Sequence, residues 1–175
     1  VNIDDFALPW TPEGSLERWL KSLPGILAAK DLLEIRDRMV KIISSGKTIL
    51  LAMGAHGIKV GLNPVIINLM EHGILQGIAM NGACIIHDAE LAMAGSTSED
   101  VAASLGRGQF GMAEETGRFL NDAITDGAKR GLGLGESVGA MLVREAFPFN
   151  RYSLLARARE LEIPVTVHVA IGTDI

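Results

Sequence analysis

The sequence has few of the residues that mark several large classes of protein. Its 175 residues include one cysteine, Cys84, so no disulfide can form within the chain, and a reducing, cytoplasmic compartment is expected. No apolar run reaches the roughly 18 residues that a membrane-spanning helix needs, and the first residues carry no secretory signal. We therefore expect a cytoplasmic protein with no membrane partner.

Basic and aromatic residues are also scarce. The 16 lysines and arginines are scattered singly, and 21 acidic residues bring the net charge to -5. Because nucleic-acid-binding proteins concentrate positive charge on one face, we expect no nucleic-acid partner. Aromatic residues make up 5% of the chain, whereas glycine occurs 20 times. This composition suits an α/β protein with glycine-rich turns between strands and helices.

Short apolar runs and longer periodic segments alternate along the chain. The runs at 48–53, 75–80 and 165–171 predict buried strands, and apolar residues at helical spacing predict helices between them. A strand, helix, strand, helix order with right-handed crossovers predicts an α/β fold with a Rossmann-like, open, mainly parallel sheet and helices on both faces. We expect a single domain over 1–175, with 1–24 as an N-terminal arm and short helix, and a fold that is incomplete at the C-terminus.

Candidate ligand-binding residues follow each predicted strand. In open parallel sheets, ligands bind outside the carboxyl ends of the strands. The first strand leads into a glycine-rich turn that has the parts of an anion cradle, although a tight connection between elements explains the glycines equally well. The candidate residues at the three strand ends are Ala55, His56, Gly57, Ile58, Lys59, Asn81, Gly82, Ala83, Thr173 and Asp174.

His87 and Asp88 are the candidate catalytic residues. They fall in the first turns of the helix after the second strand, and an imidazole serves as acid or base near neutral pH. Adjacent helical residues face different ways, so Asp88 would orient His87 while His87 reaches the ligand. The alternative is a buried histidine and an aspartate that only complements the helix dipole.

Three segments at these strand ends resemble the deoxyhypusine synthase family. Residues 55–61 lie where that family has an NAD-contacting turn, and 81–88 are similar to the Thr-Gly-Ala-Asn-Leu-Tyr-His-Asp run of its bacterial relatives. Asn150-x-x-Ser153, Ile163-Pro164-Val165 and Thr173-Asp174 follow the spacing of a third family segment. The family's Glu pair is replaced here by Ile86 and His87.

The resemblance implies NAD as cofactor and the NAD-dependent transfer of an aminobutyl-type group between amines. It implies that the strand-end residues contact the dinucleotide, with Asp174 toward the nicotinamide ribose. The expected partners are a small-molecule amine or nucleotide and further copies of this chain, as a dimer or tetramer, because the N-terminal arm carries Phe6, Trp10 and Trp19.

Two other functions compete with aminobutyl transfer. The first is a non-enzymatic family member that keeps a nucleotide crevice as a sensor or structural subunit, which the Ile86 substitution favours. The second is a metal-assisted hydrolase, in which His56, His87, Asp88, His168 and Asp174 converge on zinc or iron. No HxH or HxxxH spacing supports the metal site, so no metal ligands are assigned.

Overall fold

The computed structural model describes residues 2–97 and 113–170, which fall into two compact units. The first unit comprises 1–49 and the second 50–175, and each is described by itself. Within the described residues, no helix is both long and apolar enough to cross a membrane.

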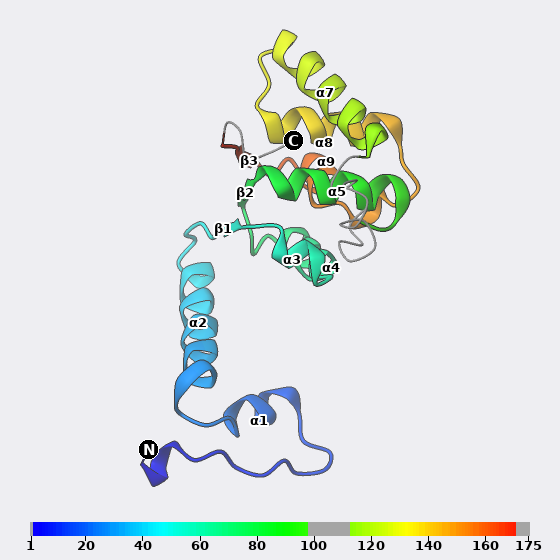
Figure 1. Ribbon diagram of the computed structural model, residues 1–175. Coiled ribbons are helices and arrows are strands. Elements are labelled where there is room, and N and C mark those ends of the chain that lie inside the picture. The colour runs from blue at the N-terminus through cyan, green and yellow to red at the C-terminus, as the bar shows by residue number, and fades with distance from the viewer. Residues whose placement is uncertain (1, 98–112, 171–175) are drawn as a thin grey trace. The chain divides into compact units, whose positions relative to one another are not determined.

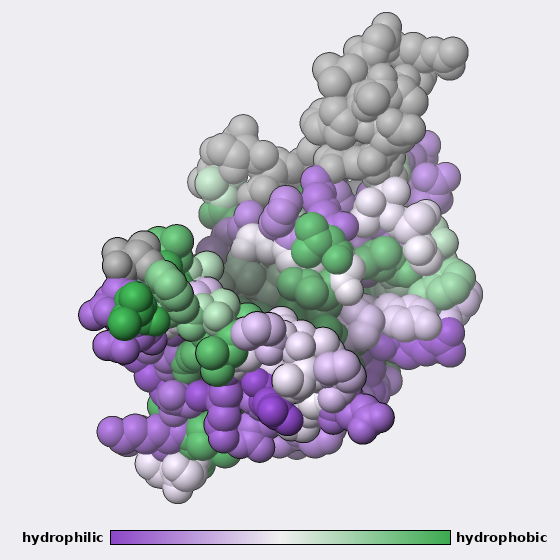
Figure 2. Space-filling view, turned by 90° about the horizontal axis from the view of Figure 1, so that it is seen from below, coloured by the Kyte–Doolittle hydropathy of each residue, from purple (hydrophilic) through white to green (hydrophobic). Residues whose placement is uncertain are grey.

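The N-terminal unit is helical. It contains the 3-10 turn η1 (Ile3–Asp5) and the helices α1 (Leu16–Lys21) and α2 (Leu27–Ser44). The Ser15 side chain begins α1 by accepting a hydrogen bond from the Arg18 amide. None of the residues in these three elements is buried. On the face drawn in Figure 2, hydrophobic residues (green) lie at the surface among hydrophilic ones (purple).

A three-stranded parallel sheet organises the second unit. Its strands are β1 (Leu50–Met53), β2 (Gly77–Asn81) and β3 (Val165–His168), in the spatial order β1-β2-β3 (Figure 1). Met53 lies opposite Met80, which in turn lies opposite Val167. The three apolar runs are therefore confirmed as strands, and the α/β class with an open parallel sheet is confirmed with them.

The two faces of the sheet differ in burial. Ile78 and Met80 of the central strand are almost fully buried, and their neighbours across the sheet on that face are half-buried. Alternate residues of the outer strands point to the opposite face, where Leu50 and His168 are exposed. The core of the unit therefore lies on one side of the described strands.

Helices fill that side. The helix α5 runs between the α3 and α4 pair and the α7 and α8 pair (Figure 1), and α8 packs closely on α9 and β3. The bounds of these elements are α3 (His56–Lys59), α4 (Asn63–Glu71), α5 (Gly82–Ala94), α7 (Glu114–Lys129), α8 (Leu134–Glu145), η3 (Asn150–Tyr152) and α9 (Leu154–Glu160).

Two glycines let α8 approach its neighbours closely. A Cβ atom at Gly139 would lie 2.7 Å from the Leu155 carbonyl oxygen of α9, and one at Gly135 would overlap the Val165 carbonyl oxygen of β3. Side chains at either position would push α8 away from the sheet. These contacts hold α8 against α9 and β3.

Candidate functional site

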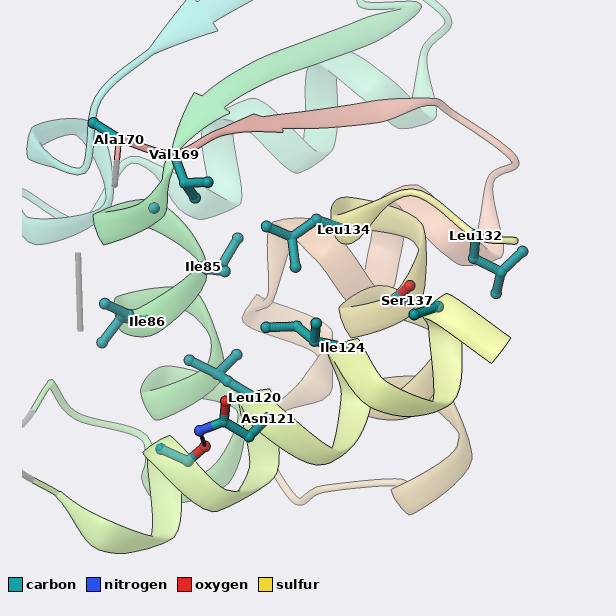
Figure 3. A pocket seen from close by; sticks show the side chains of 13 residues that line it. Ile85, Ile86, Leu120, Asn121, Ile124, Leu132, Leu134, Ser137, Val169 and Ala170 are labelled. Carbon is teal, nitrogen blue, oxygen red and sulfur yellow. Dashed lines mark hydrogen bonds between the residues drawn. The ribbon is translucent and has the colours of Figure 1, made fainter. Parts of the chain in front are cut away.

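A cavity of about 490 Å³ lies beside the carboxyl ends of β2 and β3. Its walls come from the start of α5, one face of α7, the start of α8 and the two residues that follow β3 (Figure 3). Most of the lining is aliphatic, and Asn121 and Ser137 supply its polar side chains. The lining residues are Gly82, Ile85, Ile86, Gly117, Leu120, Asn121, Ile124, Ala128, Leu132, Leu134, Ser137, Val169 and Ala170.

Both polar side chains of the cavity already hold hydrogen bonds. The Asn121 amide nitrogen donates to the Gly117 carbonyl at 2.8 Å, and the Ser137 hydroxyl donates to the Gly133 carbonyl at 2.8 Å. None of the described residues that line this cavity carries a charge. The cavity is therefore suited to a neutral, largely apolar group.

The N-terminus of α5 forms part of the wall of this cavity. The Asn81 side chain caps the helix by accepting a hydrogen bond from the Cys84 amide at 3.2 Å. The first amides of a helix have no acceptor within it, so Gly82 and Ala83 present N–H groups at the positive end of a 13-residue helix. Gly82 also lines the cavity and offers no side chain to block an approaching group.

Cys84 belongs to the core beneath this site. Its side chain is fully buried, and its Sγ lies 3.1 Å from Asn81 Oδ1 and 3.8 Å from the Met53 carbonyl oxygen. Burial raises the pKa of the Cys84 thiol. The thiol therefore stays protonated at neutral pH and is a poor nucleophile.

His87 is buried and pairs with an acid that the sequence argument missed. Its Nδ1 lies 3.0 Å from Oε2 of Glu90, three residues further along α5, and both side chains are about 95% buried. The i,i+3 spacing of a histidine and a glutamate was the signal that could have revealed this pair. The described carboxylate that contacts His87 is that of Glu90. The prediction that Asp88 orients His87 is therefore wrong, because the Asp88 side chain points to other partners.

Asp88 is fully buried and joins three segments of the chain. Its carboxylate accepts hydrogen bonds from the Ser153 hydroxyl at 2.6 Å, the Leu154 amide at 2.8 Å and the Leu155 amide at 3.0 Å. The Asn63 side chain donates a fourth at 3.1 Å. Burial raises the pKa of the Asp88 carboxyl, and these donors oppose the increase. Asp88 thus ties α5 to the start of α9 and to α4.

The turn after β1 forms the short helix α3 rather than an open loop. Ala55 and Ile58 are buried in the core, whereas His56 and Lys59 are exposed and Gly57 is half-buried. Ile58 and Lys59 line a second cavity, of about 410 Å³, together with residues of α4, α5 and η3. Ile58 and Lys59, predicted after β1, and Gly82, predicted after β2, therefore line different cavities.

The remaining predicted residues do not converge. His168 of β3 is exposed and contacts Thr166 Oγ1 at 3.0 Å, while Thr173 and Asp174 lie outside the described residues. No group of three His, Cys, Asp or Glu side chains in the described part of the chain is placed to hold a metal ion.

No family model and no curated protein matches the sequence, but several solved structures share its fold, including the three below. ArgZ, an arginine dihydrolase from the ornithine-ammonia cycle in cyanobacteria, is 19% identical over 87% of this chain and 20% of its own, with a TM-score of 0.55. An AgrE mutant in a binary complex with L-arginine is 18% identical over 94% of this chain and 21% of its own, with a TM-score of 0.58.

The third structure is a conserved putative LOR/SDH protein from Methanococcus maripaludis S2. It is 17% identical over 94% of this chain and 44% of its own, with a TM-score of 0.54. The chain thus spans about a fifth of the length of ArgZ and AgrE and less than half of the third. Identities this low show a shared fold and nothing of function.

These neighbours show that the identification with the deoxyhypusine synthase family is wrong. Aminobutyl transfer falls with it, and NAD binding loses the support of that family and stays untested. Neither the non-enzymatic nor the metal-assisted alternative gains support. The physical reason is visible at Ile86. It stands where the family carries a glutamate, and here it lines an apolar cavity that leaves a cationic polyamine without a carboxylate.

Proposed function

We propose that the second unit binds a nucleotide-type ligand at the carboxyl ends of β2 and β3, with its ring in the 490 Å³ cavity and a phosphate at the N-terminus of α5. The observation that carries the proposal is that Gly82, the first residue of α5, lines the cavity. An apolar pocket and a helix N-terminus are therefore adjacent. NAD is the first ligand to test.

The cavity fits the ring end of such a ligand. Its volume lies within the roughly 300–1,000 Å³ of small-molecule sites, and it is large enough for one nucleoside. The side chains of Ile85, Ile86 and Leu120 project into it from α5 and α7 (Figure 3). These aliphatic groups would cover the faces of a planar ring, and Asn121 would meet its polar edge.

The start of α5 fits the phosphate end. The amides of Gly82 and Ala83 point out of the helix end with its partial positive charge, which favours an anion. Asn81 would remain the helix cap, and the absent side chain at Gly82 would allow the phosphate to approach the backbone. When bound, NAD would supply a hydride acceptor beside these residues.

The same lining argues against the ligand of one structural neighbour. L-arginine is bound in the AgrE structure, and burying its guanidinium requires a carboxylate or several acceptors. The described lining residues of this cavity include no acid. L-arginine is therefore a useful negative comparison ligand.

Calorimetric titration of the chain tests the proposal. We expect saturable heat with NAD and none with L-arginine. Ile124→Trp should weaken NAD binding at least about tenfold, because the indole would occupy the cavity without overlapping the core. Ile124 is 40% exposed, so the variant should keep the fold.

Val143→Trp is the matched control, since Val143 of α8 is 36% exposed and does not line the cavity. This variant should bind NAD as the wild type does. If the wild type gives no saturable heat with NAD, or if both tryptophan variants bind equally well, the proposed site is wrong.

A further inference from the structure

The second cavity, of about 410 Å³, is lined by a residue whose side-chain oxygen has no hydrogen-bond partner. This residue is Asn63, the first of α4, which is 3% exposed. Its Oδ1 is buried and meets no donor among the described residues. A buried acceptor without a hydrogen bond costs free energy. The atom therefore indicates that a donor enters the cavity from outside the chain.

Two acceptors fix the orientation of the Asn63 amide. Its Nδ2 donates to the Tyr152 carbonyl at 2.8 Å and to Asp88 Oδ1 at 3.1 Å. Turning the amide over would lose both bonds and would set its oxygen against two other oxygens. The atom that needs a partner is therefore the oxygen, and that partner must be an N–H or O–H group.

The rest of the lining suits an uncharged ligand with an aromatic ring. Leu91, Phe149 and Tyr152 supply apolar and aromatic surface, and aromatic rings pack well against one another. Lys59 is the one charged residue of the described lining, and it is exposed. Because the described lining includes no acid, an ammonium group would be buried there without a counter-charge. The donor that reaches Asn63 should therefore be neutral.

The described lining also offers donors to such a ligand. The half-buried Thr97 lines the same cavity and carries a hydroxyl group, and Lys59 carries an ammonium group. A ligand that combines an N–H group with a carbonyl oxygen would match the acceptor of Asn63 and one of these donors. A planar amide has this combination, whereas a hydrocarbon or an amine lacks the carbonyl oxygen.

We propose that the second cavity binds a neutral aromatic amide, which donates its N–H group to Asn63 Oδ1 and packs its ring against Phe149 and Tyr152. The volume lies within the roughly 300–1,000 Å³ of small-molecule sites. The second cavity shares no described lining residue with the 490 Å³ cavity, so this site is independent of the proposed nucleotide site.

A pair of matched ligands tests the role of the Asn63 oxygen without changing the protein. In NMR titrations of the whole chain, benzamide should shift the side-chain amide signal of Asn63 saturably. Acetophenone has the same ring and carbonyl group but a methyl group in place of the NH₂ group. It should bind at least about tenfold more weakly, because Oδ1 would then stay without a donor.

Two neighbouring residues of α4 provide matched variants of the protein. Pro64 and Val65 are both exposed, but only Pro64 lines the described cavity. Pro64→Trp should weaken benzamide binding at least about tenfold by filling the cavity, and Val65→Trp should bind as the wild type does. Ile124→Trp, which blocks the other cavity, should also leave benzamide binding unchanged.

Four results would overturn the proposal. The wild type could show no saturable shift with benzamide, which would mean that the cavity holds water only. Acetophenone could bind as tightly as benzamide, the two α4 variants could behave alike, or Ile124→Trp could remove benzamide binding. The last result would place the amide in the 490 Å³ cavity. None of these results depends on whether the chain binds NAD.

Discussion

The carboxylate of Asp88 shows how a residue in a catalytic-looking motif can serve the fold instead. It receives four hydrogen bonds, from Asn63, Ser153, Leu154 and Leu155. Removing it would leave these buried donors without an acceptor, and each unsatisfied group costs free energy. The residue therefore determines how α4, α5 and α9 are held together.

We expect Asp88→Ala to lower the free energy of unfolding by about 3 kcal/mol, measured by urea denaturation. Asp122→Asn, on the exposed face of α7, should change it by less than about 0.5 kcal/mol. Similar effects of the two variants would show that the hydrogen bonds of Asp88 contribute little to stability.

The raised pKa of Asp88 gives its contribution to stability a definite pH dependence. Between the ordinary value of about 3.9 and the raised value, the folded protein binds more protons than the unfolded chain. Stability therefore falls as pH rises through this window. Relative to the non-titrating Asp88→Asn variant, the wild type should gain stability from neutral to mildly acidic pH in denaturation curves, and an opposite slope would contradict the shift.

The burial of the Cys84 thiol can be tested by chemical labelling. Because the thiol is fully buried and its pKa is raised, a thiol reagent should label the native chain only as fast as it unfolds. The denatured chain should react at once. Rapid labelling of the native protein would place the thiol at an accessible surface.

At the scale of single elements, glycines position α8. Gly139→Ala should lower the free energy of unfolding by about 2 kcal/mol, because its Cβ would lie 2.7 Å from the Leu155 carbonyl oxygen. Gly117→Ala in α7 is the control, since its Cβ would meet no atom within 4 Å, and helix propensity predicts a gain of about 1 kcal/mol. Thermal denaturation of both variants checks that the first loses stability and the second gains it.

At the scale of the whole molecule, the two units differ in how deeply their residues are buried. The central strand β2 is buried, whereas no residue of α2 is. In hydrogen exchange of dilute protein, the amides of β2 should exchange at least about 100-fold more slowly than those of α2. Equal protection of β2 and α2 in dilute protein would contradict this difference.

Local sequence signals determined the elements of this protein. Apolar runs predicted the three strands. The side chains of Asn81 and Ser153 cap the starts of α5 and α9 by accepting backbone hydrogen bonds. These signals act over a few residues, because strand burial and helix capping depend on neighbours in the chain. The same signals predicted the open parallel sheet, since short apolar strands with helical crossovers have few other arrangements.

Only the tertiary structure decided what the candidate residues do. Asp88 meets Ser153 across 65 positions of sequence, and the cavity forms where α7 and α8 reach the ends of β2 and β3. The motif at 81–88 therefore resembled a family whose chemistry it does not share. A short motif records which side chains are adjacent in sequence, whereas burial, partners and cavities depend on segments that meet only when the chain is packed.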